Sequence, residues 1–139
     1  MTTQQPDRVR QYLRRRGSAP SVVKGGLKGL VDHWESMVAA VEEGYDLTFD
    51  DYLNDMDMRD TLAGALEVAS TDDHQAIDGK LEKLDQQFRD LTVECRPIWG
   101  EKNARENGHD PTEQWWFFRR PLNPAPDFEE ELREVGLIT

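Results

Sequence analysis

Acidic side chains are the residues whose type and spacing most suggest chemistry in this chain, and they are concentrated between positions 42 and 60. This stretch holds eight acidic residues and a single base, Arg59. The acidic residues are Glu42, Glu43, Asp46, Asp50, Asp51, Asp55, Asp57 and Asp60. Large apolar residues are interleaved with them, so we expect the stretch to fold with its carboxylates facing outward. Such a surface can bind a cation or a basic protein, or simply keep the chain in solution.

A magnesium site is one chemistry that these carboxylates allow. Asp51 and Asp55 share one face of an expected helix, and Asp50 lies beside them. Mg²⁺-dependent enzymes of the phosphohydrolase type hold their ion with such helical Asp and Glu ligands, normally drawn from two helices. A second set would be Glu35, Glu42 and Glu43. Because no cluster of Lys or Arg is placed to hold phosphates, helix capping and a solvated face explain the carboxylates better. We therefore predict no cofactor, no metal and no catalytic residue.

Other catalytic patterns are missing from the sequence. His33, His74 and His109 are scattered, with no HExxH pair among them. Cys95 is the only cysteine, which excludes an intrachain disulfide, and it has no neighbouring metal-ligand spacing. We expect Cys95 to be a small buried residue.

An aromatic segment is the second candidate surface. Residues 115–118 are four consecutive aromatic residues, and Arg119, Arg120 and Pro121 follow them. The preferred interpretation is that the segment is extended and packs across the helices. The alternative is a partly exposed aromatic patch flanked by arginine, a composition that is enriched at protein–protein interfaces.

These observations predict a partner-binding surface over residues 42–60, with the aromatic segment possible as its neighbour. The residues assigned to this surface are Asp50, Asp51, Asp55, Tyr45, Tyr52, Trp115 and Arg119. The function predicted from it is a non-enzymatic, acidic module that binds a basic protein partner, comparable only by analogy of type with bacterial immunity proteins and antitoxins. The alternatives are the magnesium-dependent enzyme and a structural homo-oligomer or homodimer that associates through residues 77–95.

The charge distribution supports a protein partner over a nucleic acid. The chain has 139 residues and a net charge of −11, yet residues 1–28 carry seven bases and one acid. We expect a basic, partly flexible N-terminal arm over residues 1–20 and a single acidic helical domain over residues 21–139. Nucleic-acid binding by the acidic body is not expected. No apolar run is long enough to span a membrane, and cytoplasmic is the default location.

The hydrophobic spacing predicts an all-α fold, a small bundle of four to six helices with the aromatic segment across it. Expected helices cover residues 8–16, 22–43, 49–56, 58–69, 72–95 and 128–135. Thr48 and Asp57 each precede a helical pattern and have Asp three residues later, so both are predicted to be N-caps. The N-terminal helix has a thin apolar stripe, which predicts that residues 1–17 are dispensable for folding. As an alternative, Arg14–Arg16 would dock on the acidic cluster.

The most regular pattern is a seam of apolar residues from position 77 to position 95, spaced alternately by four and three. This seam predicts a core helix with Leu84 and Phe88 at its centre. The simplest packing partner is the helix over residues 27–43, in an antiparallel arrangement.

Overall fold

The computed structural model describes residues 7–138, which form six α-helices, one 3-10 helix and a two-stranded sheet. In chain order the elements are α1 (Arg8–Arg16), α2 (Pro20–Glu43), α3 (Phe49–Val68), α4 (Thr71–Asp90), β1 (Thr92–Glu94), α5 (Glu101–Asn107), η1 (Trp115–Phe118), β2 (Arg119–Pro121) and α6 (Pro126–Glu134). The small all-α bundle expected from the sequence is confirmed. Within residues 7–138, no helix combines the length and apolar character that crossing a membrane requires.

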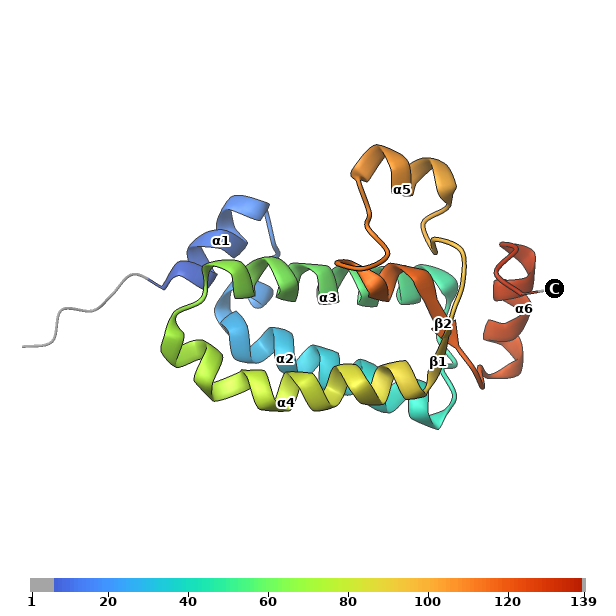
Figure 1. Ribbon diagram of the computed structural model, residues 1–139, viewed down its shortest axis with the longest axis horizontal. Coiled ribbons are helices and arrows are strands. Elements are labelled where there is room, and N and C mark those ends of the chain that lie inside the picture. Colours follow the sequence, from blue (N-terminus) through green and yellow to red (C-terminus); the bar gives the residue numbers. More distant parts are fainter. Residues whose placement is uncertain (1–6, 139) are drawn as a thin grey trace, which may run out of the picture.

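The three long helices form the body of the bundle. α2 packs against both α3 and α4, α1 crosses the end formed by α2 and α3, and α6 lies at the opposite end (Figure 1). The predicted pairing of α4 with α2 is therefore present, but its predicted antiparallel direction is wrong. Glu35 pairs with Lys80 and Glu42 with Gln87, so the two helices run parallel, and α3 between them in the sequence reverses the chain. The seam of α4 lies inside the chain, with Leu84 7% and Phe88 0% exposed, which confirms both as core residues.

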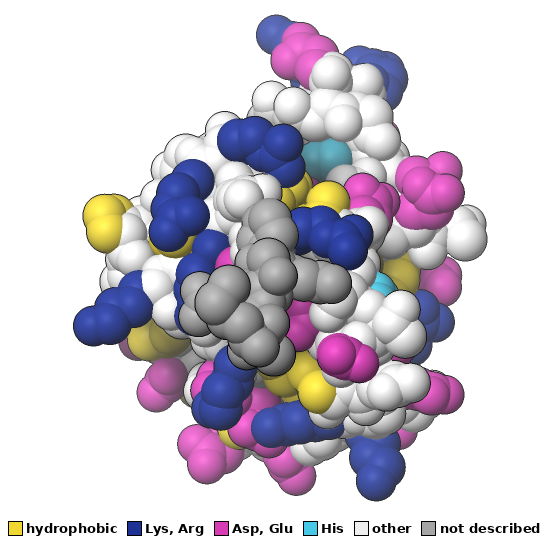
Figure 2. Space-filling model, turned by 90° about the vertical axis from the view of Figure 1, so that its left-hand side faces the viewer, with side chains coloured by type: hydrophobic (Ala, Val, Ile, Leu, Met, Phe, Trp, Pro, Cys, Tyr) yellow, Lys and Arg dark blue, Asp and Glu magenta, His cyan; other side chains and the backbone are white. Residues whose placement is uncertain are grey.

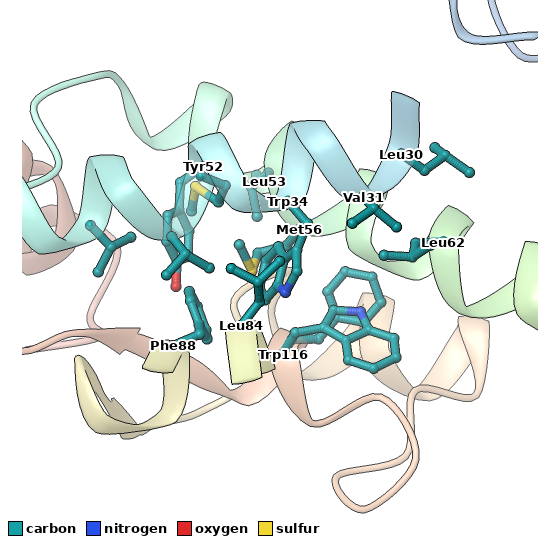
Figure 3. Packing of buried hydrophobic residues seen from close by; sticks show 14 of the residues in the cluster. Leu30, Val31, Trp34, Tyr52, Leu53, Met56, Leu62, Leu84, Phe88 and Trp116 are labelled. Carbon is teal, nitrogen blue, oxygen red and sulfur yellow. The ribbon is translucent and has the colours of Figure 1, made fainter. Parts of the chain in front are cut away.

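Aromatic side chains fill the centre of the core. The rings of Trp34 and Phe88 lie 4.8 Å apart, and Trp116 extends the apolar cluster from the aromatic segment (Figure 3). Buried side chains of this size dominate core energetics because each removes a large area from water. The core thus joins α2 and α4 to a segment nearly thirty residues further along the chain.

α3 is a single helix, so the prediction that Asp57 caps a second helix is wrong. Thr48 does cap α3, in a capping box with Asp51. At the position expected for a break, Met56 and Arg59 are both buried on the inner side of one continuous helix. The Asp57 carboxylate instead accepts a hydrogen bond from the Trp99 indole at 3.2 Å.

α4 begins and ends earlier than the sequence suggested. Ser70, not Asp72 or Asp73, is the N-cap, again with a capping box. The helix ends at Asp90 and not near Cys95, because Thr92 starts β1 and pairs with Pro121 of β2. Cys95 lies beyond this strand and is only partly buried.

The aromatic segment is not extended. Its four aromatic residues form the 3-10 helix η1, and only the residues after them are extended, as β2. The antiparallel pairing of β1 with β2 closes residues 95–118 into an excursion that carries α5, a helix not expected from the sequence (Figure 1). Gly100 and Gly108 flank α5 with positive φ, which lets the chain turn sharply into and out of it.

α1 is part of the core despite its thin apolar stripe. Val9 and Leu13 are 2% and 0% exposed. The Arg10 guanidinium donates hydrogen bonds to the backbone carbonyls of Val23 and Lys24, at 3.1 and 2.9 Å. Those carbonyls lie beside a break in α2 at Gly26, whose φ is +59°. Residues 1–6 of the predicted arm lie outside the described residues.

Candidate functional site

The fold divides the acidic stretch into carboxylates used inside the protein and carboxylates left on the surface. Asp51 serves as the capping partner of Thr48. Asp55 accepts a hydrogen bond from the Tyr45 hydroxyl at 2.8 Å, and its other oxygen lies 3.0 Å from the His33 Nε2. Two of the three carboxylates predicted to bind a partner are therefore engaged within the chain.

The two predicted tyrosines are buried, so neither is available at a surface in this structure. Tyr45 is 1% and Tyr52 0% exposed, and both rings pack against Phe128 of α6. The Tyr52 hydroxyl donates to the Arg119 carbonyl at 2.7 Å. Burial raises the pKa of both phenols, so both remain protonated donors at neutral pH. Tyr45 and Tyr52 tie α3 to α6 and to β2.

Arg119 and Trp115 lie in different surroundings. The Arg119 guanidinium donates to the Thr92 hydroxyl at 2.8 Å and to the Thr92 carbonyl at 3.0 Å, which braces the β1–β2 pair. Trp115 is half-buried beside Phe88, and the Arg89 guanidinium lies 4.2 Å from its ring centre. Trp115 therefore lies over α4 and also beside α3, where the Arg59 guanidinium is 5.8 Å from its ring centre.

The two sets of carboxylates that a helical magnesium site would need are not brought together. Glu35 pairs with Lys80 and Glu42 accepts from Gln87, both across the α2–α4 contact. Asp51 and Asp55 belong to α3 instead. In residues 7–138, no group of three His, Cys, Asp or Glu side chains is placed to hold a metal ion.

The exposed carboxylates of residues 43–50 gather with those of α6 at one end of the molecule, which we call the acidic end. The first turn of α3, which contains Asp50, and the loop before it lie beside α6. The Phe49 amide donates a hydrogen bond to the Glu131 carboxylate of α6 at 3.3 Å. Leu47, in the same loop, is 50% exposed. The exposed acidic residues of this end are Glu43, Asp46, Asp50, Asp127, Glu130 and Glu134.

The opposite end of the molecule is basic. α1 carries five arginines, and Lys24 and Lys28 lie in the first turns of α2. Figure 2 looks onto this end, where Lys and Arg side chains lie on several sides, with Asp and Glu side chains among them. The two ends are separated by the length of the long helices (Figure 1).

A second carboxylate pair lies in a cleft between α3 and the excursion, away from the acidic end. The cleft has a volume of about 460 Å³. Asp57 and Asp60, one helical turn apart on α3, form its floor together with residues from α5 and from the segment before η1. The lining residues are Arg16, Asp57, Asp60, Trp99, Asn103, Asn107, His109, Gln114 and Phe117.

The surroundings of the cleft shift the pKa of one lining carboxyl group and leave one lining ring nitrogen without a hydrogen-bond partner among the described residues. Burial raises the pKa of Asp57, and the nearby charge of Asp60 adds to this, while the hydrogen bond from the Trp99 indole opposes it. The His109 ring stacks on Phe117 with centroids 4.3 Å apart, and its Nδ1 is buried without a hydrogen-bond partner among the described residues. Buried polar atoms are normally paired, so such an atom marks a place where a partner is lacking.

Reasoning from the sequence missed this cleft. The local sequence predicts a helix cap at Asp57, and no catalytic or metal-binding motif includes His109. The lining residues are spread over about a hundred positions, from Arg16 to Phe117, so no local spacing reveals them. The only local signal was the pair of Asp residues at i and i+3 on α3.

No known protein family, curated protein sequence or solved structure matches this chain.

Proposed function

We propose that this protein is a non-enzymatic module that binds a basic protein partner, and that the acidic end is the binding surface. The observation that carries the proposal is the convergence of two separate acidic segments, residues 42–50 and α6, around an exposed leucine. Asp50 remains from the surface predicted by sequence, whereas Asp51 and Asp55 support the fold and Tyr45 and Tyr52 anchor α6 behind it.

The surface has the two components that protein recognition uses. Exposed carboxylates attract a basic partner over a distance and speed its association. Exposed apolar side chains supply area that contact removes from water. Leu47, Leu122 and Val135 are about half exposed, and they are the most exposed large apolar side chains among the described residues.

Burial of the α4 seam argues against the alternative that the protein is a homo-oligomer formed through residues 77–95. Leu81, Leu84 and Phe88 face α2 and the core, and each is at most 7% exposed. A second copy could reach this seam only if the bundle opened.

The test is a comparison of two variants with equal charge. The first, Glu43→Gln, Asp46→Asn and Asp50→Asn, removes three charges from the acidic end. The control, Glu67→Gln, Glu82→Gln and Glu113→Gln, removes three exposed charges elsewhere. A basic protein captured by the parent chain from its native lysate is identified, purified and mixed with each variant in stopped-flow experiments over a range of salt concentrations.

We expect the first variant to associate more slowly, with a weaker dependence on salt, and the control to resemble the parent. Equal loss of association rate in both variants would show that only net charge matters, which would overturn the assignment of the surface. Circular dichroism establishes that both variants keep the helical fold.

A further inference from the structure

In the cleft above α3, the side-chain donors of Trp99 and Gln114 are used in hydrogen bonds within the protein, whereas the exposed Arg16 guanidinium keeps donors of its own. The Trp99 indole donates to the Asp57 Oδ1 at 3.2 Å, and the Gln114 amide donates to the Asp60 Oδ1 at 3.0 Å. The Gln114 amide oxygen in turn accepts from the Asp110 backbone at 3.1 Å. Each of these donors is therefore engaged within the protein.

The asparagines of α5 follow the same pattern. The Asn103 amide donates to the Trp99 carbonyl, and the Asn107 amide donates to the Asn103 carbonyl, both at 2.9 Å. Because a carbonyl can only accept, these bonds fix the orientation of each side chain with the nitrogen on the backbone. The amide oxygens of Asn103 and Asn107 accept no hydrogen bond from any described residue.

The lining is thus rich in unused acceptors. The Oδ2 atoms of Asp57 and Asp60 also accept no hydrogen bond from residues 7–138, and the two carboxylates give the cleft its negative charge. A ligand that complements this lining must bring several donors and a positive charge. It must also be larger than a metal ion, because the side chains do not converge as metal ligands.

Flat aromatic surfaces complete the cleft. Trp99 and Phe117 both line it, and the volume of about 460 Å³ lies within the range of roughly 300–1,000 Å³ that is usual for small-molecule sites. A guanidinium group is planar, carries five donors and no acceptor, and stacks on aromatic rings. An ammonium group has three donors on a single atom and matches a spread of acceptors less well.

We propose that this cleft is a recognition site for a guanidinium group, either in a small molecule or in an arginine side chain of another protein. The carboxylates of α3 and the amide oxygens of α5 accept its hydrogen bonds, and the aromatic residues cover its faces. This site is separate from the acidic end, and the proposal does not depend on the function assigned to that end.

Arg16 has a particular role in this arrangement. It is the only base that lines the cleft, it is exposed, and it forms no ion pair with another described residue. Its charge lies close enough to Asp57 to affect the carboxyl group. Arg16 is therefore a built-in competitor, and its removal is expected to strengthen the binding of an added guanidinium.

The experiment measures binding to the full chain by calorimetry and by NMR. The probes are ethylguanidinium, a short peptide with one internal arginine, and the same peptide with lysine in place of arginine. The variants are Asp57→Asn, Asp60→Asn and Arg16→Gln. Arg15→Gln is the control for charge on the same helix, and Asp46→Asn is the control for a carboxylate outside the cleft.

We expect the arginine peptide to bind at least about tenfold more tightly than the lysine peptide. Asp57→Asn and Asp60→Asn should each weaken binding about tenfold or more, as loss of a charged acceptor does. Arg16→Gln should tighten binding several-fold, whereas Arg15→Gln and Asp46→Asn leave it nearly unchanged. Opposite effects of substitutions on the two sides of the cleft cannot arise from general destabilisation.

The two guanidinium probes identify the source of the group. Tighter binding of the arginine peptide points to a protein partner, and binding of ethylguanidinium alone points to a small molecule. Measurable and equal affinity for the arginine and lysine peptides would overturn the proposal, as would the absence of NMR shifts in residues 99–117 with every guanidinium probe at millimolar concentration. Should Asp57→Asn fail to fold, Asp60→Asn and Arg16→Gln still decide the result.

Discussion

A carboxylate that is partly withdrawn from water, as Asp57 is, couples the stability of the fold to pH. Its pKa is raised in the folded protein, mainly by burial and then by the charge of Asp60, while Trp99, Arg16 and His109 act in the opposite direction. Between its ordinary value of 3.8 and the raised value, the folded chain binds more protons than the unfolded chain. Stability therefore falls as the pH rises through this window.

Asp57→Asn should remove this penalty. An amide keeps an acceptor for the Trp99 indole but cannot ionise, so the variant should be more stable than the parent at pH 7. The difference should shrink as the pH is lowered toward 3.8 and below. Chemical denaturation at several pH values measures this, with the exposed Asp46→Asn as the control. A variant less stable than the parent at pH 7 would mean that the ionised form of Asp57 is favoured by the fold.

The limits of sequence reasoning are visible in single residues. Thr48 and Asp57 present the same local pattern, with Asp three residues later, yet only Thr48 is a cap. The distinction depends on Met56 and Arg59, which are buried by contacts from other elements and keep the helix continuous. The burial of Leu84 and Phe88 was predictable because regularly spaced apolar residues along a long helix indicate a buried face.

Among the elements, the contact between α1 and α3 depends on a glycine. A Cβ at Gly64 of α3 would lie 1.9 Å from the Tyr12 hydroxyl oxygen of α1. Heavy atoms cannot approach so closely, so any larger residue at position 64 must displace Tyr12. Gly79 of α4 offers the contrast, since nothing lies within 4 Å of the corresponding position.

Gly64→Ala should lower the free energy of unfolding by about 1–3 kcal/mol through overpacking. Gly79→Ala should instead raise it by about 0.5–1 kcal/mol, the usual preference of a helix for alanine. In a Tyr12→Ala background the cost of Gly64→Ala should disappear. Urea denaturation of the four variants measures these differences. If both glycine substitutions stabilise the parent equally, α1 does not approach α3 as closely as described.

Local sequence patterns do not predict α5 or the end of α4. α5 has only one buried residue, Ala104, so it shows no apolar stripe that would predict a helix. α4 was expected to reach Cys95 because the seam continues to that position, but the pairing of Thr92 with Pro121 redirects the chain. Strand pairing between positions about thirty residues apart leaves no signal in either segment alone.

At the scale of the whole molecule, the N-terminal helix completes the bundle. The sequence predicted that residues 1–17 are dispensable, since few apolar residues support α1. Two of those few, Val9 and Leu13, are nonetheless fully enclosed by α2 and α3. Their burial makes α1 a contributor to the stability of the whole chain.

Deletion of residues 1–17 should therefore lower the free energy of unfolding by about 3–6 kcal/mol, from the loss of two buried side chains. The matched control lacks only residues 1–6 and keeps all of α1. Thermal and urea denaturation compare the two truncated chains with the parent. If both unfold as the parent does, α1 does not contribute to the core in solution.

The separation of the basic end at α1 from the acidic end at α6 makes the molecule an electric dipole along its long axis (Figure 1). In the field of a charged partner such a dipole experiences a torque as well as an attraction. At physiological ionic strength the field extends only about 8 Å, so the torque acts during the last moments of approach. Its effect is then to turn the molecule into one orientation before contact, and to reduce the fraction of collisions that meet the wrong end.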